Sequence, residues 1–246
     1  MNTNDKPLKL LDSFTKILAN YSPSQMQLSI LRQTPFVLLA APTAAGRNTL
    51  IRSLLKEKDY YYIVSDTTRP PRSNDGVKEQ NGQEYWFKSE ESFLKDLDAG
   101  RYLEAAIIHD QQVSGISMRE IEKAKIAGKI AITDIDVQGC KTLEKLSDSI
   151  IPIFILPPRF EIWMQRLDGR GTMSHEEKMR RLKSAAQEID YALLSGSFSF
   201  VMNDTLDDAL KRLNAIVNKQ YDAAYQESAI RHARELLEEL TRKNSN

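Results

Sequence analysis

The stretch FVLLAAPTAAGRNTLIRSLL, from Phe36 to Leu55, decides the fold. An apolar run enters a short loop of small residues, and an amphipathic helical pattern follows directly. This strand–loop–helix order is the frame on which backbone N–H groups hold a nucleotide phosphate. The usual loop ends in Gly-Lys-Ser/Thr, whereas this one ends in Gly46-Arg47-Asn48-Thr49 and has Ala41 at the first glycine position. The stretch therefore predicts either a phosphate loop with unusual residues or a strand–turn–helix of an unrelated α/β protein.

A phosphate loop has three physical requirements: small residues beside the phosphates, a cation at the outer phosphates, and an oxygen ligand for magnesium. Ala41 suits the loop only if its φ stays negative. Arg47 keeps the positive charge, although its planar fork differs from the compact ammonium of lysine. Asn48 or Thr49 offers an oxygen to Mg²⁺. The candidate ATP-binding residues of the loop are Ala41, Thr43, Ala44, Ala45, Gly46, Arg47, Asn48 and Thr49.

Composition excludes several other classes of protein. The chain has 246 residues, of which 41% are hydrophobic, enough for one substantial core. Lysine plus arginine (34) balances aspartate plus glutamate (34), so no overall charge favours nucleic acid or an anionic membrane. The single cysteine, Cys140, excludes an internal disulfide, and three histidines make a zinc site unexpected. No run approaches the roughly 18–20 apolar residues of a membrane span, and the N-terminus lacks a signal peptide's pattern. We expect a soluble cytoplasmic protein, and the oligomeric state stays open.

Strand-like apolar runs alternate with helical patterns from residue 35 onward. The strand-like runs are Phe36–Ala41, Tyr60–Ser65, Lys129–Ile135, Ile150–Leu156 and Phe198–Met202. The helical patterns between them are Gly46–Lys58, Met118–Ala127, Val137–Leu146 and Arg159–Leu167. Strands separated by helices predict a parallel sheet covered on both faces, which is an α/β fold.

Four segments do not follow this alternation. Residues 1–34 predict a helical extension, with one helix around Pro7–Asn20 and a second opened by Ser22-Pro23. Residues 66–117 are rich in turn formers and short strands and predict an inserted lobe. Residues 169–194 form a charged helical stretch, opened by Thr172 or Ser174, that suits a mobile lid. Residues 220–246 continue a helical pattern and predict a C-terminal helical extension.

Eight blocks follow one another in the order seen in guanylate kinases. They are SDTTRPPR (65–72), NGQEYWF (81–87), YLEAA (102–106), TDIDVQG (133–139), IFILPP (153–158), RLDGRGT (166–172), RRLKSAAQEI (180–189) and VMNDTLDDA (201–209). The sequence resembles that family over about residues 35–217. The resemblance implies a three-layer P-loop NTPase fold with a parallel core sheet, over residues 35–219. It also implies an inserted GMP-binding lobe at about 66–117 and a helical lid at about 169–194.

For the acceptor nucleotide, the resemblance implies a set of GMP-binding residues. These are Ser65, Arg69, Arg72, Tyr85, Glu104, Ser114 and Asp136. Arg69 and Arg72 match the arginines that grip the GMP phosphate, a task that suits bidentate guanidinium contacts. Tyr85 would bond the same phosphate, and Ser65, Glu104 and Asp136 match residues at the guanine. An alternative makes Arg69, Arg72 and Glu104 an exposed salt-bridge network.

One part of this lobe departs from the family. Family members commonly carry a YYGT or YYGS turn whose tyrosine and hydroxyl residue both touch GMP. Here the tyrosine position holds Ser114, and the hydroxyl position falls on Ile116 or Ser117. This departure puts base selectivity in question more than the phosphate grip.

For the transfer itself, the resemblance implies a set of arginines around the phosphates. Arg166, Arg170 and Arg181 match lid arginines, and with Arg47 they are the candidate catalytic residues. Asn203 matches a position beside the adenine of ATP. Asp134, at the carboxyl end of a core strand, could hold Mg²⁺ through water, together with Asn48 or Thr49.

The resemblance implies an enzyme that phosphorylates GMP with ATP and Mg²⁺, giving ADP and GDP. A complete set of lid arginines favours catalysis, because a pure binding domain has no use for a phosphoryl-transfer clamp. Two alternatives stay open at this point. One is a non-catalytic guanylate-kinase-like binding domain, and the other is a kinase of the same fold with a different phosphorylated acceptor, such as a ribose bisphosphate.

Overall fold

The computed structural model of the chain describes residues 7–74, 77–169 and 173–244. The chain divides into two compact units. The first unit consists of Met1–Pro35 and Tyr61–Ala131, and the second of Phe36–Tyr60 and Ile132–Asn246. The division falls inside two strands, β2 (Tyr60–Tyr62) and β9 (Ile130–Asp134). Among the described residues, no helix combines the length and the apolar character needed to span a membrane.

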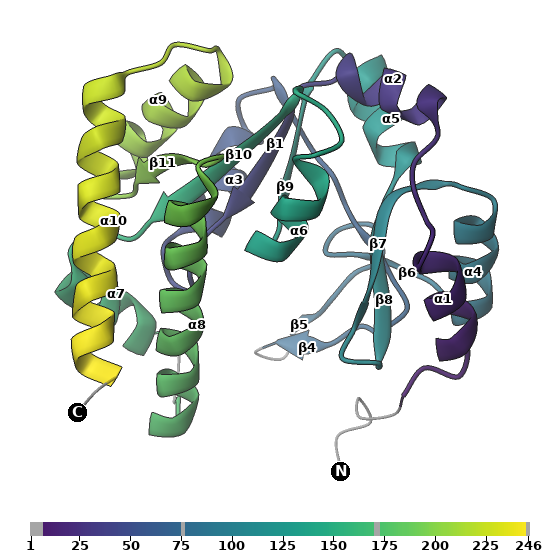
Figure 1. The fold of residues 1–246 in the computed structure, drawn as a ribbon, viewed down its shortest axis with the longest axis horizontal. Helices are drawn as coiled ribbons and strands as arrows, with labels where there is room; N and C mark the ends of the chain where they lie inside the picture. Colours follow the sequence, from purple (N-terminus) through teal and green to yellow (C-terminus); the bar gives the residue numbers. More distant parts are fainter. Residues whose placement is uncertain (1–6, 75–76, 170–172, 245–246) are drawn as a thin grey trace. The chain divides into compact units, whose positions relative to one another are not determined.

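The second unit is built on a parallel sheet. Its strand order is β11-β10-β1-β9-β2, where β1 is Phe36–Ala40, β10 is Ile150–Leu156 and β11 is Ser199–Met202 (Figure 1). Strand β10 pairs in parallel with both β1 and β11. Every residue of β1 is buried, as its unbroken apolar run predicts for a central strand. The predicted α/β fold with a parallel core sheet is confirmed.

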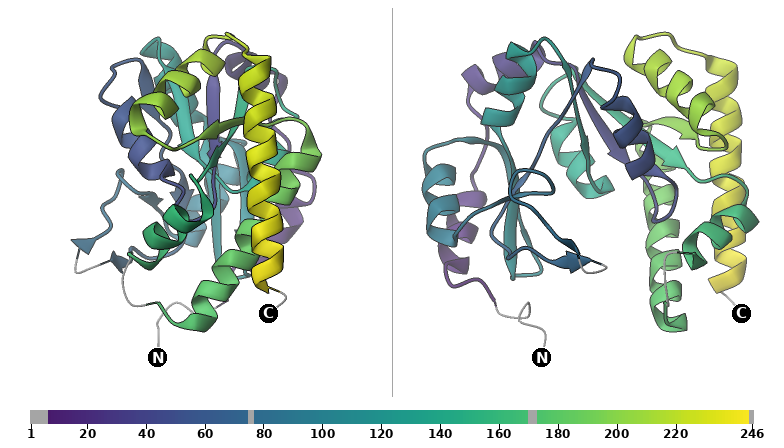
Figure 2. Two further views of the ribbon diagram at one scale, coloured as in Figure 1. Left: turned by 90° about the vertical axis from the view of Figure 1, so that its left-hand side faces the viewer. Right: turned by 180° about the vertical axis from the view of Figure 1, so that it is seen from behind.

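Helices cover this sheet in two groups. The helices are α3 (Arg47–Leu54), α6 (Val137–Leu143), α7 (Phe160–Asp168), α8 (His175–Ser195), α9 (Leu206–Val217) and α10 (Ala223–Asn244). Helix α3 packs with α9, while α6 and α10 pack with α8. The left view in Figure 2 shows α9 and α10 on opposite faces of the sheet. The helix expected over Gly46–Lys58 is shorter, because Gly46 is its left-handed cap and the helix ends at Leu54.

The first unit contains a smaller sheet of short strands. Its order is β6-β3-β8-β7, with β3 at Asp66–Thr67, β6 at Trp86–Phe87, β7 at Tyr102–Ile108 and β8 at Gln112–Ser117. A hairpin of β4 (Ser73–Asn74) and β5 (Val77–Lys78) stands apart from it. Helix α4 (Glu90–Asp98) precedes β7 in the chain, and α5 (Met118–Ile126) follows β8. Strand β7 is at the edge of the sheet.

A buried carboxylate ties this sheet together. Asp66 is 0% exposed and accepts from the Tyr102 hydroxyl at 2.8 Å. Lys88 Nζ lies 2.6 Å and Arg119 Nη2 lies 2.9 Å from its two carboxylate oxygens. A buried carboxylate is tolerated when cations and hydrogen bonds surround it in this way.

The N-terminal segment of the first unit holds α1 (Leu11–Leu18) and α2 (Gln25–Arg32). Two helices were expected, but the predicted start at Ser22-Pro23 is wrong. Ser24 caps α2: its hydroxyl accepts from the Gln27 backbone N–H at 3.3 Å, and the Gln27 side chain accepts from the Ser24 N–H at 2.7 Å. This reciprocal capping box satisfies two backbone donors, which a cap at Ser22 would leave open.

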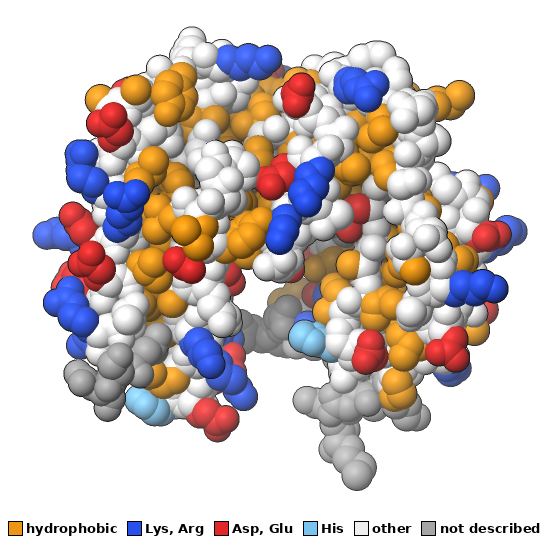
Figure 3. Space-filling view, viewed as in Figure 1, with side chains coloured by type: hydrophobic (Ala, Val, Ile, Leu, Met, Phe, Trp, Pro, Cys, Tyr) orange, Lys and Arg blue, Asp and Glu red, His pale blue; other side chains and the backbone are white. Residues whose placement is uncertain are grey.

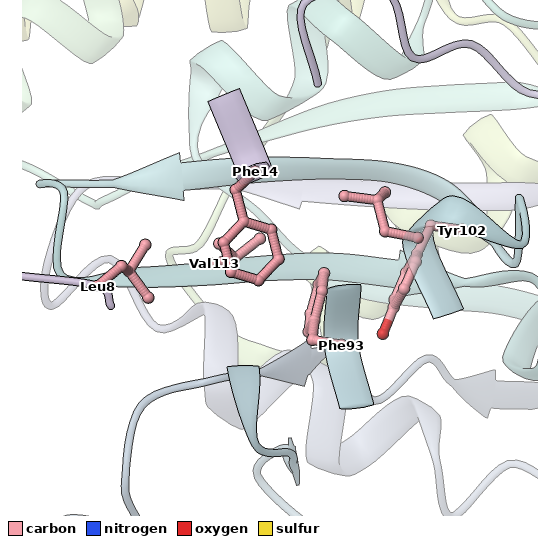
Figure 4. Packing of buried hydrophobic residues seen from close by; sticks show 6 residues of the cluster. Leu8, Phe14, Phe93, Tyr102 and Val113 are labelled. Carbon is pink, nitrogen blue, oxygen red and sulfur yellow. The ribbon is translucent and has the colours of Figure 1, made fainter. Parts of the chain in front are cut away.

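A hydrophobic cluster joins the N-terminal segment to the rest of the first unit (Figure 4). Its buried members are Leu8, Phe14, Phe93, Leu97, Tyr102 and Val113. The Phe14 ring meets Phe93 edge-on at 6.0 Å, and Phe93 stacks on Tyr102 at 4.4 Å. Aromatic pairs in these geometries add to the gain from burial alone.

Charges of both signs are mixed on the surface. On the face seen in Figure 3, basic and acidic side chains lie among one another, and neither kind gathers into one large patch. This distribution agrees with the balanced charge of the sequence, 34 basic against 34 acidic side chains.

Candidate active site

The phosphate-loop stretch has a backbone suited to an anion. Gly46 (φ 98°) and Ala44 (φ 68°) are both left-handed, and they lie between β1 and the first residue of α3, Arg47. Left-handed residues next to right-handed ones turn successive N–H groups toward one concavity, which binds anions. Ala41 is not among the described residues with positive φ, so the condition set for this alanine is met. Left-handed alanine costs about 1–2 kcal/mol, a strain typical of functional loops.

Two side chains from distant segments hold this loop in place. The buried Asn203 amide, just after β11, donates to the carbonyl of Ala45 at 2.7 Å. The indole N–H of Trp163 on α7 donates to the carbonyl of Thr43 at 2.8 Å. Asn203 was expected beside the adenine of ATP, and here its amide fixes the loop. Sequence reasoning missed Trp163. The signal that could have found it is that the N–H of a buried indole needs a hydrogen-bond acceptor.

Gly46 is the one loop position that admits no side chain. A Cβ on it would lie 2.1 Å from the Asn203 amide nitrogen. We expect Gly46→Ala to lower the free energy of unfolding by about 2–4 kcal/mol, since it adds a steric clash to the cost of positive φ. Urea unfolding measures this change. Gly196→Ala is the matched control, because Gly196 has φ 67° with open space around it. Equal losses in the two variants would contradict the Asn203 contact.

Arg47 is held by the carboxyl end of β9. Its Nη2 donates to Asp134 Oδ2 at 2.8 Å and its Nη1 to the Ile135 carbonyl at 3.5 Å. The two side chains are 26% and 30% exposed, so the pair borders solvent. Asp134 was expected near the loop, at the end of a core strand, and the structure confirms that position. The arrangement places a guanidinium at the start of α3, beside the loop amides.

Glu188 on α8 is a further acidic group near Arg47. Burial raises the pKa of Glu188 to about 7, and the positive charge of Arg47 opposes this rise. The negative charge of Asp136, the N-cap of α6, adds to it. Sequence reasoning gave Glu188 no role, since a glutamate in a charged helix looks like a solvated side chain.

Of the oxygen donors suggested for Mg²⁺, Asn48 and Thr49 are exposed on the first turn of α3. Asp134 accepts from Arg47. The described residues contain no group of three or more His, Cys, Asp or Glu side chains placed to hold a metal. Beside phosphates, Mg²⁺ commonly binds through one or two carboxylates together with water and phosphate oxygens.

Two of the three arginines expected in the lid lie on described helices. Arg166 on α7 donates to the Asn203 carbonyl at 3.4 Å, next to the loop. Arg181 on α8 donates to Glu177 at 2.8 Å, one turn earlier on the same helix. Arg170 and Thr172 lie outside the described residues. The Ser174 hydroxyl accepts from the Glu177 N–H and caps α8. Ser174 is one of the two residues expected to open this helix.

In the first unit, Arg69 is clamped by Glu79. The guanidinium makes two bonds to the carboxylate, at 2.5 and 2.8 Å, and lies over the Tyr85 ring at 4.7 Å. Glu79 also accepts from the Arg72 backbone N–H at 2.8 Å. Arg69 is 7% exposed. The alternative of an exposed salt-bridge network therefore does not describe Arg69, and Glu79 is a residue of this site that sequence reasoning missed.

The candidate base-reading residues are divided between the units. Glu104 on β7 is half-buried, and Ser114 on the neighbouring strand β8 donates its hydroxyl to Thr67 at 2.9 Å. The Ser65 carbonyl accepts from the Trp86 N–H at 2.9 Å. Asp136 belongs to the second unit, where it caps α6.

The two candidates for the hydroxyl position of the family's turn, Ile116 and Ser117, both have structural roles. Ile116 is buried in β8. The Ser117 hydroxyl accepts from the Arg119 backbone N–H and caps α5.

The Arg69–Glu79 pair predicts an acid-sensitive contribution to stability. Hydrogen bonds from Arg69 hold the pKa of Glu79 below its ordinary value of 4.5. A depressed folded-state pKa gives stability that is complete above the unfolded pKa and is lost as pH falls through the folded one. We expect Glu79→Gln to lower the free energy of unfolding by about 1–3 kcal/mol at pH 7.

As the pH falls through the lowered pKa of Glu79, the wild-type carboxylate is protonated as well, and this difference should shrink toward zero. Urea unfolding at a series of pH values tests the prediction. Glu122→Gln, at an exposed carboxylate of the same unit, is the control. A difference that stays constant with pH would contradict the role given to the charge of Glu79.

Comparison with known proteins points to one family. The model of the family described as guanylate kinase matches residues 32–220. The guanylate kinase of Caldanaerobacter subterraneus subsp. tengcongensis is 36% identical over 192 residues, covering 77% of this chain and 89% of that protein. The guanylate kinase of Bifidobacterium longum is 34% identical over 190 residues, covering 75% and 94%. The crystal structure of guanylate kinase from Anaplasma phagocytophilum is similar in fold, with a TM-score of 0.55, 24% identity, and coverage of 76% and 86%.

Proposed function

The chain belongs to the guanylate kinase family, and we infer that it uses the loop and lobe described above to transfer the γ-phosphoryl group of ATP to GMP, giving ADP and GDP. The two alternatives, a non-catalytic domain and a kinase for another acceptor, are not favoured, because the matching relatives are guanylate kinases. The observation that carries the proposal is the Arg47 guanidinium, fixed by Asp134 beside a loop with an anion-binding backbone. Arg47 thus keeps a positive charge at the position where the usual loop has lysine.

The proposed donor site is the loop between β1 and α3. Its backbone N–H groups would surround the β-phosphate of ATP, and Arg47 would reach the outer phosphates. Bound phosphates would compete with Asp134 for the Arg47 fork, so we expect this ion pair to loosen when ATP binds. Asn203 would act through the loop, since its amide is committed to Ala45.

Magnesium fits the donor set at this loop. Mg²⁺ prefers oxygen ligands and keeps several waters, so Asn48 or Thr49 could supply one oxygen. Asp134 would hold the ion through water, since its carboxylate already accepts from Arg47. When bound, the ion supplies positive charge next to the transferring phosphoryl group.

Most residues of the proposed acceptor site belong to the first unit. Arg69, with Arg72 and Tyr85, would bind the GMP phosphate, and Glu79 keeps the Arg69 fork in place until the phosphate arrives. Glu104 would accept from the N1–H and N2–H₂ donors of guanine, which adenine does not offer in that pattern. Ser65, Ser114 and Asp136 are the further candidates at the base.

In the proposed reaction, a GMP phosphate oxygen attacks the γ-phosphorus of ATP as the bond to the β–γ bridging oxygen breaks. The attacking dianion needs no general base. Catalysis then depends on charge and position around the equatorial oxygens. Arg47, Arg166 and Arg181 would supply this charge, together with Arg170. Closure of the lid would bring Arg181 to the phosphates and exclude water.

A coupled assay of ADP release tests this function. We expect turnover with ATP to be stimulated strongly by GMP, less by dGMP, and not by AMP or by buffer alone. Binding of GMP without stimulated turnover would favour the non-catalytic alternative. Stimulation only by another phosphorylated compound would favour the other kinase.

We also propose that the kinase domain spans residues 35–219, with the lobe at about 66–117 and the lid at about 169–194. The family match over residues 32–220 supports these outer limits. A cytoplasmic location and the absence of nucleic-acid and membrane partners stay predictions. Their support is the balanced charge and the single, buried Cys140.

A further inference from the structure

The N-terminal segment, residues 7–34, packs on the proposed acceptor lobe. This segment lies almost entirely before the match to the family, which begins at residue 32. Helix α1 contacts α4 and β7, and α2 contacts α5. Figure 1 shows α1 beside α4 and α2 beside α5. The Leu8 N–H donates to the Asp110 carbonyl at 2.9 Å, and the Leu10 N–H donates to Glu90 at 2.9 Å. The segment is therefore a structural part of the first unit.

Tyr21, between α1 and α2, binds the open edge of β7. Its hydroxyl donates to the Tyr102 carbonyl at 2.6 Å and accepts from the Tyr102 N–H at 3.1 Å. Gln27 adds a bond from its side-chain amide to the Gly100 carbonyl at 2.6 Å. An edge strand presents backbone groups that need partners. One tyrosine hydroxyl here serves both backbone groups of a single residue.

The residue that Tyr21 fixes directly precedes an irregularity in the strand. The pairing of β7 with β8 shifts register between Tyr102 and Glu104. Such a bulge re-aims the side chain that follows it, and its geometry depends on how the strand is held on either side. Glu104 is the carboxylate proposed to read guanine. The negative charge of Glu104 also reaches Tyr21, since it adds to the burial that raises the pKa of Tyr21.

The side chain of Tyr102 connects to a second part of the site. Its ring is stacked on Phe93, which Phe14 of α1 meets edge-on (Figure 4). Its hydroxyl donates to the buried Asp66 at 2.8 Å, next to the base-reading candidate Ser65. The N-terminal segment thus binds the backbone of Tyr102 directly and reaches its ring through Phe93.

We propose that Tyr21 is a positioning residue for Glu104, so that the N-terminal segment forms part of the GMP site. This inference rests on the proposed function. Tyr21 does not touch the nucleotide in this account; it fixes the strand backbone from which Glu104 projects. The segment therefore tunes recognition of the acceptor base and leaves the ATP loop unchanged.

The variant Tyr21→Phe tests the proposal, because it keeps the ring and removes the two backbone bonds. We expect the KM for GMP to rise about five- to tenfold, the range for losing a hydrogen bond that positions a group. The KM for ATP and kcat should change less than about twofold. Tyr60→Phe is the matched control, since it removes a hydroxyl bond of 2.6 Å to Asn214 in the second unit. It should leave the KM for GMP unchanged.

A double-variant cycle separates positioning from a general effect on the fold. In the Glu104→Gln background, Tyr21→Phe should have little further effect on the KM for GMP, because both changes act on one contact. Full additivity would overturn the proposal, and so would an equal rise in the two KM values. If the wild-type chain shows no GMP-stimulated turnover, the proposed function fails first. If the wild type is active and Tyr21→Phe leaves the KM for GMP unchanged, the role of Tyr21 is wrong and the proposed function stands.

Discussion

Replacing Arg47 by alanine should lower kcat/KM for GMP phosphorylation by about 10²–10³-fold, the usual loss when one preorganised donor at the reacting group is removed. The guanidinium is the cation at the start of α3, where the loop N–H groups converge. Asp134 and the Ile135 carbonyl hold the fork, so the protein itself fixes the position of the guanidinium. Steady-state kinetics at saturating ATP measures the loss.

Arg52→Ala is the control for this variant, since Arg52 lies on the same helix but is exposed. It should stay within about twofold of the wild type. The double variant Arg47→Lys with Asn48→Ser restores the usual loop residues. We expect it to lose about tenfold, because a lysine cannot bridge Asp134 and the Ile135 carbonyl with a planar fork. A large gain would contradict this and would mean that the native loop is impaired.

Replacing Arg69 by methionine should raise the KM for GMP about 10²-fold and leave the KM for ATP nearly unchanged. Arg69 is buried and its fork is oriented by two bonds to Glu79, so a GMP phosphate that takes over these bonds would meet a guanidinium already in position. Truncating one member of a buried, hydrogen-bonded charge pair costs about 2–5 kcal/mol, and this variant also leaves Glu79 without its partner. Initial rates over a range of GMP concentrations give the KM.

Arg69→Lys separates the two causes, because it keeps the charge for Glu79 but loses the fork. We expect an intermediate rise of about tenfold in the KM for GMP. Arg101→Met is the control in the same unit, since Arg101 bonds Asp96 at 2.7 Å with 65% of its side chain exposed. If Arg69→Met and Arg101→Met had the same effect, the proposed phosphate grip would be wrong.

The order of strands and helices in the second unit could be predicted because its signals are local. The fully apolar Phe36–Ala40 run, the small residues after it and the helical spacing from Arg47 each report on their immediate neighbours. Asp134 could be placed near Arg47 as well, since the carboxyl ends of parallel strands meet at one edge of a sheet.

The contacts that fix the site could not be predicted in the same way, because their partners are far apart in the chain. Asn203 and Ala45 are separated by 158 positions, and Tyr21 and Tyr102 by 81. Glu79 lies closer to Arg69, but a glutamate in a turn-rich, charged stretch looks like a solvated side chain. The start of α2 was misplaced for a different reason: Ser22-Pro23 fits a local helix-start pattern, but the Ser24-x-x-Gln27 capping box, which is equally local, marks Ser24 as the cap.

The fate of a labelled phosphate tests whether this variant loop supports phosphoryl transfer to GMP. ATP labelled at the γ-phosphorus is incubated with the chain, Mg²⁺ and GMP, and the products are separated by ion exchange. We expect GDP labelled at its β-phosphorus, formed in the same amount as ADP. Label that stays in ATP, or that leaves only as inorganic phosphate while GMP is bound, would contradict this expectation.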